Sequence, residues 1–153
     1  MLCNYSDRER EQGVIIKTWK AFSYKAATYP LDHLSAFEWE FIQAAKGDKE
    51  PRTYRFVIEF GLHCFTRGLN IHAGKELHHI DRDLYYSDSR ETRIFSFVRY
   101  ELSFNLPDIA KSVDGRPCYH TGRGNFFVID LLGSNEEKVE YEVYFQISRE
   151  RRG

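Results

Sequence analysis

Four of the chain's six histidines lie in one stretch, residues 60–83, which reads FGLHCFTRGLNIHAGKELHHIDRD. Histidine changes its charge near neutral pH, so it serves as a general acid or base and as a metal ligand. His63 falls on the polar face of a strand predicted for residues 53–65, together with Arg55 and Glu59. This pattern predicts either an open sheet surface or an imidazole that acts beside a carboxylate and a guanidinium.

Cys64 falls on the opposite, apolar face of that strand, which favours a small buried side chain over a metal ligand or nucleophile. Further along, a helix over residues 72–83 would place His72, Glu76 and His79 on one face, as a metal site requires. The HExxH spacing is absent and glycine interrupts the first turn, so a polar surface loop is the competing interpretation.

A second segment that could bind a ligand is RPCYHTGRGNFF, residues 116–127. Gly122 and Gly124 flank Arg123, so backbone amides there could hold an anion beside Arg123 and His120. The alternative is a turn before a strand, made flexible by its glycines. Neither the Lys-Ser/Thr ending of a P-loop nor the GxGxxG pattern is present, so the sequence shows no established phosphate-binding motif here.

The three cysteines, Cys3, Cys64 and Cys118, leave one unpaired in any pairing and lie far apart, which argues against a disulfide framework. A structural zinc that joins His63 or Cys64 to Cys118 and His120 is an alternative, but no CxxC spacing supports it. We therefore predict no bound metal and no cofactor. The charged start and the lack of an apolar run of roughly 20 residues predict a cytoplasmic location and no membrane partner.

Overall charge limits the classes of partner. The chain of 153 residues has 22 Lys and Arg against 23 Asp and Glu, a net charge of -1. No global basic field draws it to nucleic acid, so such binding needs a local patch. Aromatic residues make up 16% of the chain, which favours strands and bulky packing of a sheet on helices.

Two hairpins are predicted from alternating patterns. Phe37, Trp39 and Phe41 alternate with glutamates, which is typical of a half-buried strand. A turn with Gly47 in positive φ and Pro51 joins it to the strand over residues 53–65. Near the end of the chain, residues 125–132 and 138–148 predict a second hairpin.

Helices are expected between the hairpins. Asp88 followed by Glu91 resembles a capping box, which predicts a helix from about Ser89. Its apolar stripe toward the sheet would consist of Ile94, Phe95, Val98 and Leu102. Pro107 predicts a break and a second, short helix, because proline fits a first turn but not a helix interior.

These elements predict an α+β fold: a single domain with a largely antiparallel sheet of two hairpins, packed on one face by one long and one short helix. The domain is expected to span residues 36–148. A partly ordered N-terminal arm, residues 1–35, precedes it, and a basic tail, residues 149–153, follows it.

The function predicted from these residues is action on RNA or single-stranded nucleic acid, in its sharpest form as a metal-independent ribonuclease. Such cleavage needs a base, an acid and cations that stabilise the phosphorane. His63 and His120 would be the base and acid, with Glu59 beside His63. Phosphate and nucleobase contacts would come from Arg55, Arg90, Arg93, Arg123 and Tyr144.

Two other hypotheses stay open. One is a non-enzymatic interaction module, such as an adaptor, an inhibitor or an immunity-type protein, with a protein partner that pairs with the final strand at a sheet edge. The other is a zinc-binding protein that uses the histidines of residues 63–79. The oligomeric state is left open.

Overall fold

The structure is a computed structural model, and it describes residues 2–5, 17–69, 80–113, 119–120, 125–132 and 138–149. For residues 2–5, 119–120, 125–132 and 138–149 the description covers the backbone, with the side chains of Val143 and Tyr144 in addition. The chain divides into two compact units. Unit 1 consists of Met1–Ile16, Ala36–Glu59 and Asp108–Gly153, and unit 2 of Lys17–Ser35 and Phe60–Pro107.

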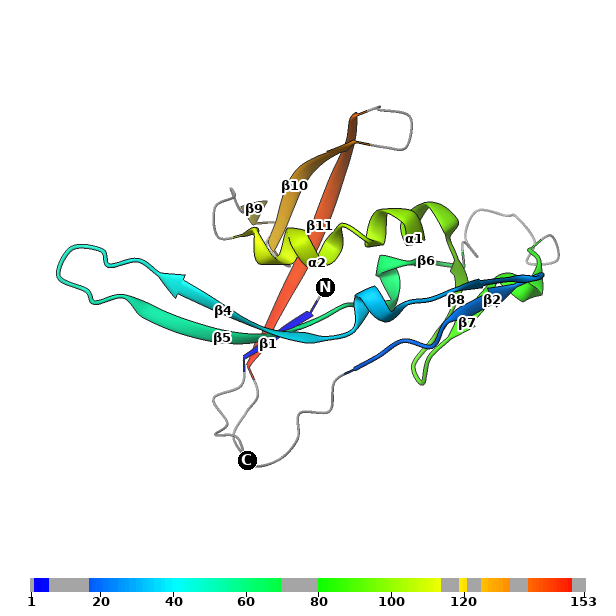
Figure 1. Ribbon diagram of the computed structural model, residues 1–153, viewed down its shortest axis with the longest axis horizontal. Helices are drawn as coiled ribbons and strands as arrows, with labels where there is room; N and C mark the ends of the chain where they lie inside the picture. The colour runs from blue at the N-terminus through cyan, green and yellow to red at the C-terminus, as the bar shows by residue number, and fades with distance from the viewer. Residues whose placement is uncertain are drawn as a thin grey trace. The chain divides into compact units, whose positions relative to one another are not determined.

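Unit 1 contains a six-stranded sheet in the order β4-β5-β1-β11-β10-β9 (Figure 1). Its strands are β1 (Leu2–Tyr5), β4 (Phe37–Gln43), β5 (Arg52–Glu59), β9 (Tyr119–His120), β10 (Asn125–Leu132) and β11 (Lys138–Arg149). Both predicted hairpins, β4–β5 and β10–β11, are confirmed. Strand β1 links them, because it pairs antiparallel with β5 and parallel with β11. The predicted α+β class with a largely antiparallel sheet is also confirmed.

The predicted alternation accounts for burial along these strands. Phe37, Trp39 and Phe41 are half-buried, and the glutamates between them are exposed. On β11, Val143 is 5% exposed and its neighbour Tyr144 is 54% exposed. Strand β4 therefore presents one apolar face, which is the pattern of a sheet with one covered side.

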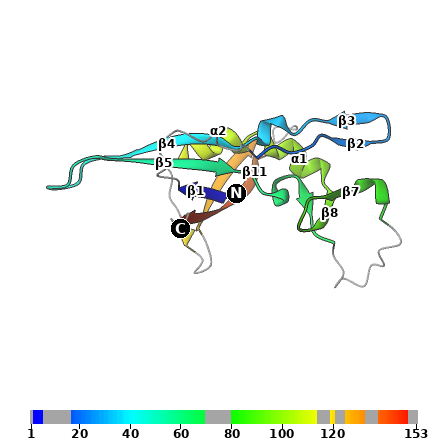
Figure 2. The same cartoon turned by 90° about the horizontal axis from the view of Figure 1, so that it is seen from below.

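Strands β4 and β5 continue past β1 as a two-stranded extension (Figure 2), which we call the ribbon, residues 37–56. Strand β1 pairs with the end of β5 nearest to Glu59, from Phe56 onward. The turn of the ribbon has Gly47 at φ 61, as predicted, with Lys46 and Lys49 bridged across it. Within the part of the chain that the structure describes, β4 has a strand neighbour on one side only.

Unit 2 is built from a hairpin, a small sheet and short helical turns. The hairpin pairs β2 (Phe22–Tyr24) with β3 (Ala27–Tyr29), and the antiparallel sheet has the order β6-β8-β7. Its strands are β6 (Thr66–Arg67), β7 (Tyr85–Ser87) and β8 (Thr92–Phe95). The 3₁₀ turns are η1 (Asp32–Leu34), η2 (Leu62–Cys64) and η5 (Arg82–Leu84).

The core of unit 2 is aromatic. Phe60, Phe65 and Phe95 are each below 2% exposed. The ring of Phe22 stacks on Phe95 with centroids 3.9 Å apart, and the indole N–H of Trp19 donates to the Phe60 carbonyl at 3.1 Å. Burial of these large rings is the main stabilising contribution in this unit.

The described residues form two α-helices, α1 (Phe97–Ser103) and α2 (Leu106–Lys111). Pro107 lies in the first turn of α2, as predicted, and Leu106, Ile109 and Ala110 are buried. No helix in the described ranges has the length and apolar character that crossing a membrane requires.

The predicted helix start at Ser89 is wrong, because Asp88 and Glu91 belong to a turn between β7 and β8. Asp88 Oδ1 accepts from the backbone N–H of Arg90 at 2.8 Å and of Glu91 at 2.9 Å. An aspartate can cap a helix or close such a turn with the same acceptor oxygen, so the local pattern does not separate the two. Helix α1 instead begins after Ser96, whose Oγ accepts from Arg99 N–H at 3.4 Å.

The apolar stripe predicted for that helix is wrong for the same reason. Ile94 and Phe95 are buried, but they lie on β8. Val98, which does lie on α1, is 67% exposed.

The strand predicted for residues 53–65 ends earlier, at Glu59. Gly61 follows in an extended conformation, and the chain then enters the 3₁₀ turn η2. His63 and Cys64 therefore lie on a turn, and the face assigned to each from strand alternation is wrong. Cys64 is half-buried rather than fully buried.

Candidate functional site

The predicted catalytic residues are divided between the two units. His63 belongs to unit 2, whereas Glu59 and His120 belong to unit 1. The backbone of His120 lies on β9, at the edge of the sheet. The side chain of His120 lies outside the described part of the chain, so the pairing of His63 with His120 stays a prediction.

The predicted phosphate-binding residues have separate local roles. Arg55 pairs with Glu40 on the ribbon, with Nε and Oε1 2.7 Å apart. Arg90 is exposed in the turn before β8, and Arg93 is held in unit 2 by Thr66 and Glu91. Tyr144 is exposed on β11, and Arg123 lies outside the described residues.

The metal-site hypotheses fall mostly on residues that the structure does not describe. These are His72, Glu76, His79 and Cys118. Among the side chains that it does describe, no group of three His, Cys, Asp or Glu residues could hold a metal ion. The glycines at 122 and 124 also lie outside the described ranges.

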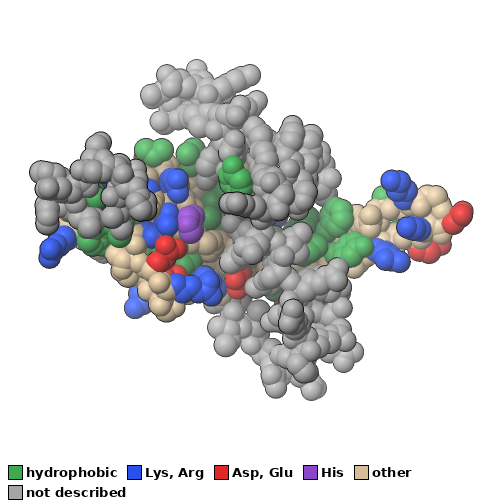
Figure 3. Space-filling view, turned by 180° about the vertical axis from the view of Figure 1, so that it is seen from behind, with side chains coloured by type: hydrophobic (Ala, Val, Ile, Leu, Met, Phe, Trp, Pro, Cys, Tyr) green, Lys and Arg blue, Asp and Glu red, His purple; other side chains and the backbone are tan. Residues whose placement is uncertain are grey.

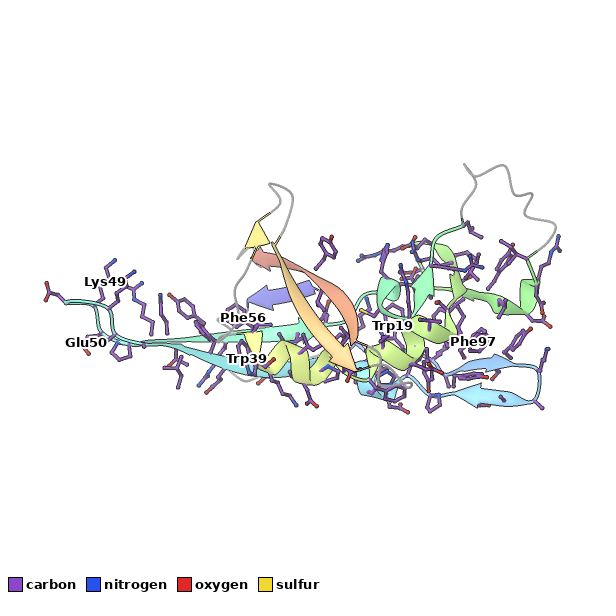
Figure 4. The ribbon with its side chains drawn as sticks, turned by 90° about the horizontal axis from the view of Figure 1, so that it is seen from above. Trp19, Trp39, Lys49, Glu50, Phe56 and Phe97 are labelled. Atoms are coloured by element: carbon purple, nitrogen blue, oxygen red, sulfur yellow. The ribbon has the colours of Figure 1, made fainter. Side chains whose placement is uncertain are left out.

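The first candidate surface is an aromatic ladder on the ribbon. Trp39 lies directly opposite Phe56 across β4 and β5, and Phe41 lies opposite Tyr54. The ring centroids of these pairs are 6.1 and 6.2 Å apart, and all four side chains are half-buried. Figure 4 marks Trp39 and Phe56, with Lys49 and Glu50 at the turn. Such cross-strand pairs stabilise a hairpin, and here part of each ring stays exposed.

The other face of the ribbon is charged. Glu38 and Glu40 are exposed on β4, and the ion pair of Glu40 with Arg55 is exposed on both sides. Ile42, on the same face, is 66% exposed. Figure 3 shows hydrophobic side chains along the ribbon and charged side chains of both signs at its tip.

The sheet edges differ from the prediction. The final strand, β11, lies between β1 and β10, so the prediction that it forms an edge is wrong. Among the strands that the structure describes, β4 and β9 lie at the edges of this sheet. Strand β4 is the longer of the two, with seven residues, and it carries half of the aromatic ladder.

The second candidate lies at the turn η2. It consists of His63 on that turn and of two arginines that bond to the turn or to the residue Thr66 after it, Arg93 and Arg99. We call these three residues the His63 site. Arg99 Nη1 donates to the carbonyl oxygens of His63 and Thr66, at 3.1 and 2.7 Å. Thr66 is fully buried, and its O–H donates to the Leu62 carbonyl at 2.6 Å. Its Oγ1 also accepts from Arg93 Nε at 2.9 Å. Thr66 thus connects both arginines to one turn.

Positive charge exceeds negative charge in the His63 site. Glu91 Oε2 lies 3.2 Å from Arg93 Nη1. Among the described side chains, no carboxylate pairs with Arg99, whose hydrogen bonds go to carbonyl oxygens. Partial burial of the ring and then the charge of Arg93 lower the pKa of His63 below 6.5. Glu91 acts in the opposite direction, and Arg99 adds to the lowering. The imidazole is therefore mostly neutral at pH 7.

A contact between a histidine and a serine was not predicted from the sequence. His33 Nε2 lies 2.7 Å from Ser103 Oγ, and the Ser103 O–H donates to the Tyr100 carbonyl at 2.6 Å. Because serine has one O–H, His33 Nε2 must carry the proton and donate it to Ser103. Ser103 is also fully buried, so this pair ties η1 to α1 and is not a base with its nucleophile. The two residues are 70 positions apart, so no local motif indicates the contact.

Comparison with known proteins gives one family. A family model described as the YjaZ family matches residues 21–153. Protein YjaZ of Escherichia coli (strain K12) is 28% identical over 139 residues, which cover 90% of this chain and 75% of that protein. No solved structure matched the chain.

These matches overturn the hypothesis of a nucleic-acid-directed protein or ribonuclease. Neither the family description nor the relative's name refers to nucleic acid or to a nuclease. Arg55, one of the predicted phosphate-binding residues, pairs with Glu40. Since the family model covers most of its length, the chain belongs to the YjaZ family.

Proposed function

We propose that this protein is a polypeptide-binding module that takes up an extended, basic segment of a partner protein along β4. The observation that carries the proposal is a half-exposed aromatic ladder on an edge strand. An edge strand offers unpaired backbone N–H and C=O groups, and an added strand satisfies them by β-augmentation.

The ladder favours an occupant with apolar side chains at alternate positions. Trp39 and Phe41 project to one face of β4, and a strand added beside β4 would place its own alternate side chains next to them. Large aromatic side chains contribute most of the binding energy in many interfaces. A ribbon of two strands is also marginally stable alone, so a third strand stabilises it.

The charged face selects the sign of the partner. Glu38 lies opposite Val57, so it has no basic partner across the hairpin, unlike Glu40. Lysine or arginine on an added strand would lie beside both glutamates, and opposite charges in such pairs are favourable. The partner segment therefore alternates apolar residues with Lys or Arg.

The same glutamates disfavour a second copy of this chain as the occupant. An antiparallel copy of β4 centred on Trp39 places Glu38 against Glu40 twice, and one centred on Glu40 places that residue against itself. Like charges directly opposite each other are destabilising, and charged edge strands are a known protection against self-association.

The test uses seven-residue peptides, which match the length of β4. A library that alternates apolar residues with random residues is screened for peptides that bind the protein. Affinities are measured from Trp39 fluorescence in a Trp19→Phe background. We expect enrichment of Lys and Arg at the random positions. We also expect a loss of about tenfold or more when alternate peptide amides are N-methylated, because methylation removes the ladder hydrogen bonds.

Charge reversal provides the matched variants. Glu38→Lys with Glu40→Lys should change the preference from basic to acidic peptides, whereas Glu101→Lys, at an exposed position of α1, should leave it unchanged. Enrichment of acidic peptides by the wild type, equal binding of methylated peptides, or no selected binder at all would each contradict the proposal.

We also infer a reducing, cytoplasmic location from Cys64. This residue is a free cysteine, and burial raises the pKa of its thiol, so it remains an unreactive thiol. Alkylation of freshly lysed cells followed by mass spectrometry should find it reduced; a disulfide to Cys64 would contradict this location.

A further inference from the structure

We propose that the His63 site binds an oxyanion, the carboxylate or phosphate group of a small molecule, through His63 and Arg99, with Arg93 as a further positive charge. This site lies in unit 2 and does not depend on the ribbon, which lies in unit 1.

The geometry of Arg99 supports the proposal first. Both of its hydrogen bonds leave from Nη1, to the carbonyl oxygens of His63 and Thr66. A guanidinium has five N–H donors in a fixed fork. Among the described residues, Nε and Nη2 of Arg99 have no acceptor, so they keep donors for a ligand. The two carbonyl contacts fix the position of the fork, which lowers the entropy lost when an oxyanion binds.

The charge balance supports it next. Arg93 is only 12% exposed and pairs with Glu91, which leaves Arg99 as the guanidinium without a carboxylate in the described part of this site. The guanidinium groups of Arg93 and Arg99 both bond to Thr66 and repel each other. An anion between Arg99 and His63 reduces that repulsion. Charge-assisted hydrogen bonds from arginine to an oxyanion are among the stronger ones in proteins.

Thr66 accounts for the rigidity of the arrangement. It is fully buried and makes hydrogen bonds to Leu62 and Arg93, and its carbonyl accepts from Arg99. A side chain at the centre of such a network holds both arginines in place before a ligand arrives.

The ionisation of His63 provides the reporter for a test. Among the described residues, Arg93, Glu91 and Arg99 are the charged groups near its ring, and partial burial with the two arginines lowers the pKa. A bound anion opposes those causes, so it should raise the pKa. His33 is an internal control, because its pKa is lowered by burial and the opposing charge near it is Asp32.

The experiment follows the imidazole signals of His63 and His33 by NMR through a pH titration in sodium chloride, sodium sulfate or sodium acetate at equal ionic strength. Sulfate represents a phosphate group and stays a dianion throughout, and acetate represents a carboxylate. We expect sulfate, acetate or both to raise the pKa of His63 by about half a unit to one unit and to leave His33 unchanged.

Variants separate specific binding from general screening. Arg99→Gln should abolish the rise, Arg99→Lys should retain part of it, and Arg90→Gln, at an exposed arginine outside the site, should retain all of it. The proposal is overturned if neither salt changes the His63 titration relative to chloride, or if Arg99→Gln keeps the change while its remaining spectrum shows the native fold. Peptide binding by the ribbon is measured separately, so either proposal can fail without the other.

Discussion

The chain contains two groups of aromatic residues that differ in depth rather than in type. In unit 2, Phe65 has ring contacts with Trp19, Tyr86 and Phe95 at centroid distances of 5.3, 5.0 and 6.2 Å, and it is fully buried. On the ribbon, Trp39 contacts Phe41 at 5.9 Å and Phe56 at 6.1 Å, and it is half-buried.

The comparison teaches that the depth of burial decides whether an aromatic residue contributes mainly to stability or to binding. A ring enclosed on several sides gains the full free energy of burial, so it stabilises the fold. A half-buried ring keeps part of its apolar surface in water, and another chain can cover that surface. We therefore expect the core rings to control stability and the ladder to control binding.

The largest contrast should come from matched truncations in the two regions. Phe65→Ala should lower the free energy of unfolding by about 3–5 kcal/mol, and Phe41→Ala by about 1 kcal/mol or less. Urea unfolding followed by Trp19 fluorescence in a Trp39→Phe background measures both. If Phe65→Ala does not fold, Phe65→Leu provides the smaller step. Equal losses at the two positions would contradict the comparison.

A smaller contrast is expected for threonine. Thr66→Val keeps the shape of a fully buried side chain but removes the acceptor for Arg93 Nε and the donor to the Leu62 carbonyl. We expect a loss of about 1–3 kcal/mol. Thr53→Val, at an exposed position of the ribbon, should change stability by about 0.5 kcal/mol or less. Thermal unfolding of both variants is the measurement, and a stable Thr66→Val protein would show that the buried network is dispensable.

A still smaller difference in the free energy of unfolding is expected between two side-chain hydrogen bonds, one in each unit. Ser103→Ala removes the acceptor of the His33 Nε2–H in a partly buried contact, which should cost about 1 kcal/mol. Tyr54→Phe removes an exposed hydrogen bond of 3.2 Å to Gln43 Oε1. The loss should be about a few tenths of a kcal/mol, because exposed polar pairs contribute little to stability. Chemical unfolding compares them, and a larger loss for Tyr54→Phe would reverse the expected order.

The smallest effect should be that of pH. The pKa values of His33 and His63 are lowered in the folded state from 6.5, so the unfolded chain binds more protons as the pH falls below 6.5. Stability from these groups should be fully present above that pH and decline below it. Unfolding of the wild type and of His33→Gln with His63→Gln, at about pH 5 and pH 7.5, measures the difference. A decline of the same size in the double variant would assign it to other groups.

The sequence by itself determined the parts of the fold that depend on local periodicity. Alternation of aromatic and charged residues identified β4–β5 and β10–β11, and Pro107 placed the start of α2. These features were predictable because side chains alternate across a strand whatever lies around it, and because proline has no N–H to donate. The predicted N-terminal arm, residues 1–35, stays a prediction.

Only the tertiary structure decided what the polar residues do. Asp88 closes a hairpin turn instead of capping a helix, and His63 lies on a turn instead of a strand face. Arg99 was not singled out from the sequence, although it holds that turn through two carbonyl groups. The physical reason is that hydrogen bonds and charge pairs form between residues far apart in the chain, whereas the sequence pattern records only neighbours.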